Sequence, residues 1–320
     1  MQKKLILTLA IAAVAVITVF VAAALVPSIL VSSSGPSIKS VAVTWGLLGE
    51  IVYRLGGGEI EVYQLLPPGA EIHDWEPTPE AVELVGKSRL LIYTGLGLDD
   101  WAVKLGEVTN VKVFKAAYDL PILITYEKEG HEIDHTHDEE HEHAHGMVDP
   151  HIWLSPRNTA KLVENIAGEL VQVFPEYKEK INDNMRMLIA ELRELDREIE
   201  FGLKPYAGRV FITQHDAFQY LARSYGLRAE GILGPEEEEP TSSKLAEIYD
   251  LISREGIKVV YAEDGLIKPV LESIKRDTGV EILMLNTGEA LTLEDVKQGR
   301  GYTWIMRENF RTLVEGFRLG

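Results

Sequence analysis

The chain has 320 residues, of which 46% are hydrophobic and 26% charged, so it is long enough for two ordinary domains and has the composition of a globular protein. Its formal net charge of −18 argues against a nucleic-acid partner, because binding phosphates requires clustered Lys and Arg, whereas a cation suits an acidic surface. The absence of cysteine excludes disulfides, thiolate metal sites, thiol catalysis and lipidation of an N-terminal Cys, so any metal site must use His, Asp and Glu.

Residues 1–36 have the pattern of a membrane segment followed by a polar spacer. Lys3 and Lys4 precede an almost uninterrupted apolar run from Leu5 to Val31. A cleaved signal peptide has an apolar core of about 7 to 15 residues and a spanning helix about 20, so the length favours an uncleaved signal-anchor, a transmembrane helix. Cleavage near Ala22–Ala24 is the alternative. In both cases the positive-inside rule places the rest of the chain on the extracytoplasmic side, either anchored or secreted.

From about residue 37, short β-branched runs alternate with amphipathic stretches, which predicts α/β structure with parallel sheets. In the first half, Ser40–Thr44 and Ser88–Thr94 are expected strands and Thr78–Val85 an expected helix. The alternation returns after Pro205, with strands expected at 209–213, 257–262 and 280–285. The sequence therefore predicts an N-terminal α/β lobe over residues 37–157 and a C-terminal α/β lobe over residues 206–320.

Between the two halves, residues 158–205 form a helical linker that is broken once, at Pro175. One continuous helix from Glu176 to Leu203 would be about 42 Å long at 1.5 Å per residue, which suits a rigid spine between two lobes. A long surface helix on a single large domain is the alternative, and periodicity does not separate the two. Ligands of doubly wound sheets bind beyond the carboxyl ends of the strands, so two facing lobes predict a cleft walled by the loops that follow strands.

Three of the nine histidines stand apart from the others along the chain. His73, His151 and His215 each fall beside an expected strand end or helix start. Three neutral imidazoles converging on one ion suit zinc, which takes His nitrogen at about 2.0 to 2.1 Å in tetrahedral geometry. A single such histidine is more often structural, so the prediction of a metal site depends on all three meeting in space.

The other six histidines lie in one segment, residues 131–145, together with six Asp or Glu and no apolar pattern. This composition predicts a disordered, histidine-rich loop that binds metal weakly as an auxiliary site. A solvated acidic insertion is the alternative, although it does not account for two thirds of the histidines. The six residues of this auxiliary loop are His131, His135, His137, His141, His143 and His145.

Five stretches of the chain carry a resemblance to a known family. They are Leu65–Glu80, Tyr93–Trp101, Met147–Asn158, Phe211–Leu227 and Gly234–Ile252. Through them the chain, from about Ser40 to its C-terminus, resembles the substrate-binding proteins (cluster A-I) of zinc and manganese ABC importers, in particular the zinc-binding ZnuA-like branch. The resemblance implies two Rossmann-like lobes joined by a long rigid backbone helix, with the metal ion at the lobe interface.

The same resemblance implies that His73, His151 and His215 are metal ligands, because they occupy the ligand positions of the family's motifs. It implies a monomeric binding protein rather than an enzyme. Such a protein captures Zn²⁺ as its cargo and delivers it to an ABC transporter permease, which works with a cytoplasmic ATPase. Manganese-specific members have a carboxylate where this chain has His215, and manganese prefers oxygen ligands, so zinc is favoured over manganese.

The fourth ligand is where the sequence departs from the family's pattern. Many members have an Asp in a segment resembling Leu-Asp-Pro-Leu-Gly after a late strand, whereas this chain has Asn286 in the corresponding run, Leu-Asn-Thr-Gly. A neutral amide is a weak ligand, so the site either holds a water or recruits another side chain. The candidates are Asn286, Glu263, Asp264 and Glu289.

Residues around the ligands have expected supporting roles. Asp74 and Asp149 are candidate acceptors that orient the imidazoles, and Trp75 and Trp153 are candidate walls of the site.

Two other functions compete with the transporter subunit. A zinc-dependent hydrolase also holds its metal with three histidines, but the sequence has no HExxH motif that pairs ligands with a general base. A manganese-specific or adhesin-type member of the same fold is not separated from a zinc transporter subunit by sequence.

Overall fold

The computed structural model describes residues 39–125, 147–234, 239–263 and 267–320. The expected membrane segment and the histidine-rich loop both lie outside these residues, as does Asp264. Within the described ranges, no helix combines the length and the apolar character needed to cross a bilayer. The chain divides into residues Met1–Ser37 and a body, Ile38–Gly320, which is described below.

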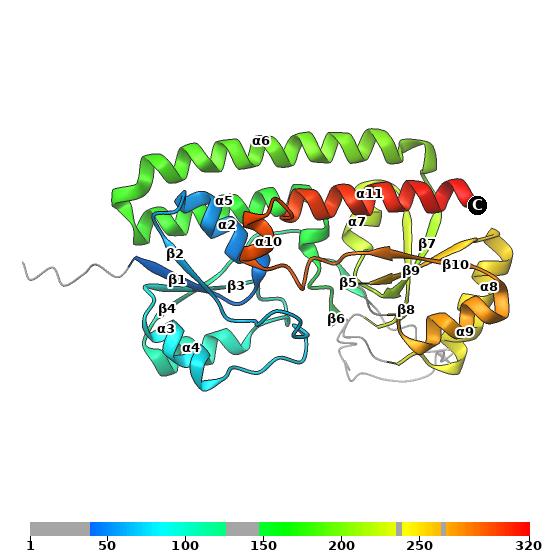
Figure 1. Cartoon of the computed structure of the whole chain (residues 1–320), viewed down its shortest axis with the longest axis horizontal. Coiled ribbons are helices and arrows are strands. Elements are labelled where there is room, and N and C mark those ends of the chain that lie inside the picture. Colours follow the sequence, from blue (N-terminus) through cyan, green and yellow to red (C-terminus); the bar gives the residue numbers. More distant parts are fainter. Residues whose placement is uncertain (1–38, 126–146, 235–238, 264–266) are drawn as a thin grey trace, which may run out of the picture. The chain divides into compact units, whose positions relative to one another are not determined.

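The first lobe is built on a four-stranded sheet in the order β2-β1-β3-β4, in which every pair is parallel (Figure 1). Successive side chains of a strand point to opposite faces, and both faces of this sheet are covered. Val41 and Val43 of β1 therefore enter the main core, whereas Ala42 packs with residues of α3 and α4 on the other face. The elements of this lobe are β1 (Ser40–Val43), α2 (Gly46–Gly56), β2 (Glu61–Gln64), α3 (Pro79–Gly86), β3 (Leu90–Tyr93), α4 (Trp101–Thr109) and β4 (Lys112–Lys115).

The second lobe repeats this plan with a parallel sheet in the order β10-β9-β7-β8. Ile212 and Val260 pack with residues of α8 and α9, whereas Phe211 and Tyr261, one position away, enter the main core. The two parallel sheets confirm the α/β prediction and the strands that were expected in each half. The elements of this lobe are β7 (Val210–His215), α7 (Gln219–Ser224), β8 (Arg228–Leu233), α8 (Ser242–Glu255), β9 (Val259–Glu263), α9 (Pro269–Thr278) and β10 (Glu281–Leu285).

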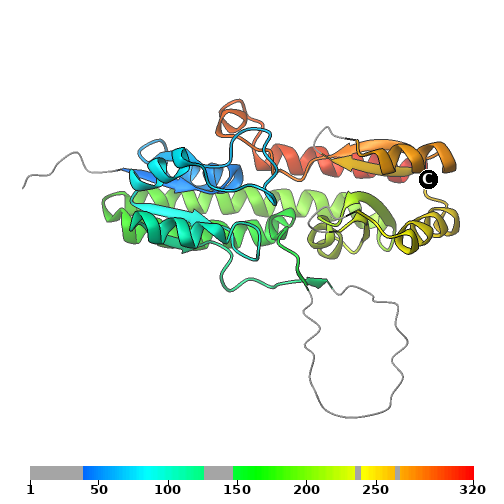
Figure 2. The same cartoon turned by 90° about the horizontal axis from the view of Figure 1, so that it is seen from below.

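Helix α6 (Lys178–Leu203) is the spine of the body and spans both lobes in each view (Figure 1, Figure 2). Its 26 residues correspond to about 39 Å at 1.5 Å per residue. The helix begins at Lys178 rather than at the expected Glu176, because Pro175–Tyr177 form a 3-10 turn after α5 (Pro156–Val173). From Ile189 onward its buried side chains recur every three or four positions, the period of one apolar face. The buried side chains of α6 are Ile181, Leu188, Ile189, Leu192, Leu195, Ile199 and Leu203.

Helix α11 (Tyr302–Leu319) runs parallel to the spine and is held to it by side-chain bonds (Figure 1). The Thr303 hydroxyl donates to Glu191 at 2.5 Å, and Arg307 donates to Glu198 at 2.8 Å. The remaining short elements are β5 (Ile124–Thr125) paired with β6 (Met147–Val148), the 3-10 turns Ile152–Leu154 and Lys204–Tyr206, and α10 (Leu293–Lys297).

After β10 the chain returns to the first lobe before it enters α11. Helix α10 lies against α2, and the backbone N–H of Tyr302 donates to Glu50 of α2 at 2.7 Å. The approach is close at Gly46, where a Cβ atom would stand 1.7 Å from the carbonyl oxygen of Leu291. One main core contains residues of both lobes, so the division of the chain at residues 157 and 205 stays a prediction.

Candidate metal centre

His73 lies in the irregular segment between β2 and α3, and its side chain is directed inward by its neighbours. Ile72 is buried, and the half-buried Trp75 packs on Trp101 at the start of α4, with ring centroids 4.8 Å apart. These apolar contacts on both sides of His73 hold the segment against the lobe, so that the His73 side chain is only 7% exposed.

His151 lies between β6 and the 3-10 turn Ile152–Leu154 and is fully buried. Asp149 accepts two hydrogen bonds from it, one from the backbone N–H and one from Nδ1, both at 2.9 Å. The expected orienting role of Asp149 thus has a matching contact in the structure. Asp74, the other candidate acceptor, is exposed.

His215 is the last residue of β7, and Glu263 is the last residue of the adjacent strand β9. The carboxylate of Glu263 accepts the backbone N–H of His215 at 3.2 Å and a short hydrogen bond from its Nδ1. Both residues stand at the carboxyl ends of parallel strands, where the sequence analysis expects a ligand site.

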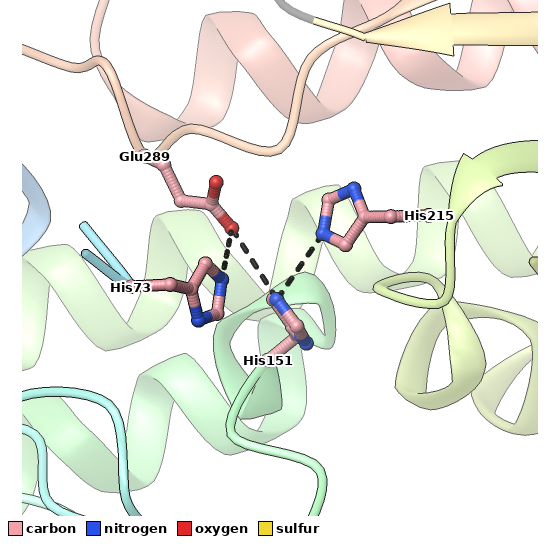
Figure 3. A group of neighbouring side chains, drawn as sticks. All are labelled: His73, His151, His215 and Glu289. Carbon is pink, nitrogen blue, oxygen red and sulfur yellow. Dashed lines mark hydrogen bonds and ion pairs between the residues drawn. The ribbon is translucent and has the colours of Figure 1, made fainter. Parts of the chain in front are cut away.

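Glu289 follows β10 and completes a group of four with the histidines (Figure 3). Its Oε1 lies 3.3 Å from Nε2 of His151 and 3.9 Å from Nε2 of His73. The Nε2 atoms of His151 and His215 are also 3.3 Å apart. In the part of the chain that the structure describes, this is the one group of at least three His, Asp or Glu side chains placed to hold a metal ion, with all four ligand atoms within 4.8 Å of one another.

The two shortest of these separations match the geometry of a tetrahedral zinc site. Four ligand atoms at about 2.0 to 2.1 Å from one ion stand about 3.3 to 3.4 Å from one another along the edges of a tetrahedron. Two of the measured separations equal this edge, and the distance from His73 to Glu289 exceeds it by about half an ångström.

The hydrogen bonds at Nδ1 determine whether Nε2 carries a lone pair that can bind a metal ion. A neutral imidazole that donates from Nδ1 carries its lone pair on Nε2, so His151 and His215 present two lone pairs to each other. Two acceptors at this distance repel each other unless a cation, either a proton or a metal ion, lies between them. The donor set therefore requires positive charge at its centre.

The electrostatics of the buried group agree with this requirement. Burial alone lowers the pKa of His151, but its hydrogen bonds with Asp149 and Glu289 outweigh that effect and raise the pKa to about 10. For His215, burial likewise lowers the pKa and the charge of Glu263 raises it, with a net upward shift. Burial raises the pKa of Glu289, but the facing histidines lower it to about 2. A proton and a divalent cation would compete for this anionic centre.

Three of the four candidates for the fourth ligand lie in described residues, and they have different surroundings. The side-chain oxygen of Asn286 accepts the N–H of Gly288 at 2.7 Å, within its own loop. Glu263 faces Nδ1 of His215 and so supports a ligand from outside the group. Only the Glu289 carboxylate, among these three, lies between the histidines.

The two tryptophans near the ligands differ in their contact with the site. The ring centroid of Trp153 lies 5.2 Å from that of His151, so this side chain walls the centre on one side. Trp75 contacts Trp101 and supports the His73 segment from outside. The pairing of Glu263 with His215 was missed by the sequence analysis, although a carboxylate that ends a buried strand beside another ligand-bearing strand was a usable signal.

The chain matches a family model and is similar to two curated zinc proteins. The model of a family described as "Zinc-uptake complex component A periplasmic" matches residues 41–316. The zinc-binding lipoprotein AdcA of Streptococcus pneumoniae is 33% identical over 280 residues, which cover 86% of this chain and 55% of AdcA. The high-affinity zinc uptake system protein ZnuA of Bacillus subtilis is 34% identical over 278 residues, which cover 86% of each protein.

A solved structure is similar as well. The Zn(II)-bound ZnuA-like domain of Streptococcus pneumoniae AdcA matches with a TM-score of 0.70 and 29% identity, over 87% of this chain and 98% of that domain. The chain spans only 55% of the full length of AdcA, and the matching part corresponds to this one domain.

Proposed function

The chain belongs to the family of zinc-uptake complex component A, and on that premise we propose that its body captures Zn²⁺ between the two lobes and delivers it to an ABC importer. The observation that carries the proposal is the pair of Nε2 atoms of His151 and His215, 3.3 Å apart with both Nδ1 atoms bonded to carboxylates. The proposed ligands are His73, His151, His215 and Glu289, with Zn²⁺ as cargo rather than as a resident cofactor.

The donor set supports zinc over manganese. Three imidazole nitrogens and one carboxylate oxygen form a set that zinc accepts in tetrahedral geometry, whereas manganese prefers oxygen ligands. Two relatives, AdcA and ZnuA, are named for zinc binding and zinc uptake. A manganese-specific function is therefore the weaker alternative.

The same set argues against a zinc hydrolase. Catalytic zinc sites keep one position open for water or substrate, and here Glu289 stands where that position would be. The other two carboxylates of the centre, Asp149 and Glu263, are bonded to Nδ1 atoms and do not face the ion. A capture site, in which protein atoms supply all four ligands, agrees with a binding protein that is not an enzyme.

Delivery requires a partner that accepts the ion. We propose an ABC permease with its cytoplasmic ATPase, and a monomeric body whose lobes shift slightly on docking, since α6 joins them rigidly. The apolar run from Leu5 to Val31 would anchor the body on the extracytoplasmic face as a signal-anchor, or leave it secreted if cleaved. AdcA is named a lipoprotein, but this sequence has no cysteine for a thioether-linked lipid.

The histidine-rich loop, residues 131–145, is proposed to collect ions weakly and pass them to the centre. Deleting the loop should leave the tight site nearly unchanged and slow the loading of zinc at low concentration, which stopped-flow measurements with a zinc indicator would follow. A large loss of affinity at the tight site would contradict this division of roles.

The proposed function is tested by zinc titration in competition with a chelator. The full chain, purified with detergent, is compared with the triple variant His73→Ala, His151→Ala, His215→Ala. We expect one tight site in the wild type, absent from the variant, with weak binding at the loop retained in both. Tight binding that survives in the triple variant would show that the histidines are structural. Competition by Mn²⁺ in the same titration separates the two metals.

A further inference from the structure

The side chain of Trp153 contacts one proposed ligand with its ring and the loop of another proposed ligand with its indole N–H. The Trp153 ring lies against the His151 ring, with centroids 5.2 Å apart. It also packs on the Trp45 ring, with centroids 4.6 Å apart. The indole N–H of Trp153 donates to the backbone carbonyl of Thr287 at 2.7 Å. Thr287 is two residues before Glu289, so one buried side chain contacts one proposed ligand and the loop of another.

The backbone of Trp153 is fixed independently of the metal centre. Its carbonyl oxygen accepts the Tyr302 hydroxyl at 2.7 Å and the Thr159 hydroxyl at 3.0 Å. The side chain is 1% exposed, so its indole N–H has no water to bond if the carbonyl of Thr287 moves away. Trp153 is thus a rigid donor against which the loop is placed.

The loop of Glu289 has its own fixed points on either side of the carboxylate. On one side, Asn309 of α11 bonds the backbone N–H and carbonyl of Asn286, at 2.8 and 2.7 Å. On the other side, the Gln64 side chain donates to the carbonyl of Leu291 at 3.3 Å. Between these points Gly288 has a φ of +83°, a conformation that glycine adopts without strain, and the bond from Trp153 falls next to it.

These contacts lead to one inference, which rests on the proposed ligand set. We propose that Trp153 is a positioning residue that holds Glu289 within ligand distance of His151, so that the centre binds its ion with four protein ligands instead of three. The bond from Trp153 to Thr287 fixes the loop relative to the proposed ligand two residues before Trp153. Without it, the loop keeps its contact with Asn309 but loses its direct tie to the turn that follows His151.

A double-mutant cycle tests this role in the full chain, purified with detergent. The four proteins are the wild type, Trp153→Phe, Glu289→Ala and the double variant, and the affinity for Zn²⁺ is measured by chelator competition. Phenylalanine keeps a ring beside His151 but has no N–H donor. Replacing groups that orient metal ligands typically weakens metal affinity 10- to 100-fold. We expect a loss of about that size from Trp153→Phe when Glu289 is present, and less than about threefold in the Glu289→Ala background.

A matched control is Tyr225→Phe, because Tyr225 is also a buried aromatic residue and its hydroxyl donates to Asp196 of the spine at 3.1 Å, so the variant loses a buried donor outside the Glu289 loop. It should keep wild-type affinity within about threefold. As a second readout, Co²⁺ in the wild type should give the intense visible absorption of four-coordinate cobalt. Trp153→Phe should shift this spectrum in the same direction as Glu289→Ala.

The outcomes separate the inference from the proposed function. Equal losses from Trp153→Phe with and without Glu289, no loss at all, or an equal loss from Tyr225→Phe would overturn the role of Trp153. Unchanged affinity in Glu289→Ala alone would overturn the ligand set and the inference with it. Circular dichroism checks that Trp153→Phe is folded. If it is not, benzothienylalanine replaces phenylalanine at position 153 in the cycle, because it has the shape of tryptophan but no N–H.

Discussion

The carboxylate of Asp149 accepts two hydrogen bonds from His151, from its backbone N–H and from its Nδ1 atom, both at 2.9 Å. Neither residue is exposed to solvent. One carboxylate therefore sets both the backbone conformation and the tautomer of a proposed ligand, and the lone pair of His151 is fixed on Nε2.

Asp149→Ala should weaken zinc affinity about 10- to 100-fold, because the imidazole loses the acceptor that orients it. Asp149→Asn should lose less, since the amide oxygen still accepts both N–H groups while the negative charge is gone. Chelator competition on the two variants measures the difference. Asp277→Ala, which removes an exposed carboxylate bonded to Tyr249 in the second lobe, serves as the control. An unchanged affinity in Asp149→Ala would contradict the orienting role.

Metal removal should lower the melting temperature of the protein. An ion that binds only the folded state stabilises it by about 2.7 kcal/mol at a free concentration one hundred times the dissociation constant. For a chain of this size, that corresponds to a shift of roughly 4 to 5 °C. Scanning calorimetry with and without a chelator would record the shift. The triple histidine variant should melt at one temperature under both conditions, and a shift that persists in it would place the stabilising ion elsewhere.

The titration of Asp99 predicts a pH dependence of the protein's stability that does not involve the metal centre. This carboxylate is fully buried and accepts bonds from the Thr44 hydroxyl and from the N–H groups of Thr94 and Gly95. Burial raises its pKa from 3.8 to about 6, against the effect of these donors. Because the folded state binds the proton more tightly, Asp99 stabilises the fold below about pH 4, and this contribution is lost as the pH rises through about 6.

The loss amounts to about 3 kcal/mol, since the folded and unfolded pKa values differ by about 2. Asp99→Asn does not titrate, so the free energy of unfolding of the wild type, minus that of the variant, should fall between pH 4 and pH 7. Urea denaturation with a chelator present measures this difference. Parallel pH profiles for the two proteins would contradict the prediction.

Gly46→Ala should destabilise the protein and disturb the metal centre. The new Cβ atom would lie 1.7 Å from the carbonyl oxygen of Leu291, a backbone atom two residues beyond Glu289. Overpacking of this kind costs about 1 to 3 kcal/mol and would displace the loop, so zinc affinity should fall as well. Gly86→Ala is the matched control, because a Cβ atom in α3 at that position meets nothing within 4 Å and alanine favours the helix. Equal stability of the two variants would contradict the close contact.

The two sheets could be predicted from the sequence because strands buried on both faces leave continuous apolar runs, such as Ser88–Thr94 and 209–213. The return of residues 291–306 to the first lobe, called the crossing below, could not be predicted from the sequence. Helix α11 has one apolar face, and that pattern is the same whichever lobe the helix packs against. The crossing is seen in the structure, for example in the close contacts at Gly46 and Glu50.

The candidate ligands could be selected from the sequence, but their meeting could not, because His73, His151 and His215 are separated by more than sixty positions each. The fourth ligand shows most clearly what the sequence leaves open. Glu263 ends β9 and Glu289 follows β10, and only the three-dimensional path of the chain decides which carboxylate faces Nε2 atoms and which faces Nδ1. Ligation by these four residues stays a proposal until it is measured.

The bond between Glu50 and Tyr302 joins positions 252 residues apart. Closing a contact so distant in sequence costs more chain entropy than closing a local one, and it requires both ends of the body to be present. During synthesis, the three proposed histidine ligands precede Glu289, and α11 follows it. A growing chain thus has the imidazoles before it has the carboxylate and before it has α11. The metal centre therefore depends on residues from α2 to α11 being present together, so retention of an ion reports that the body has closed.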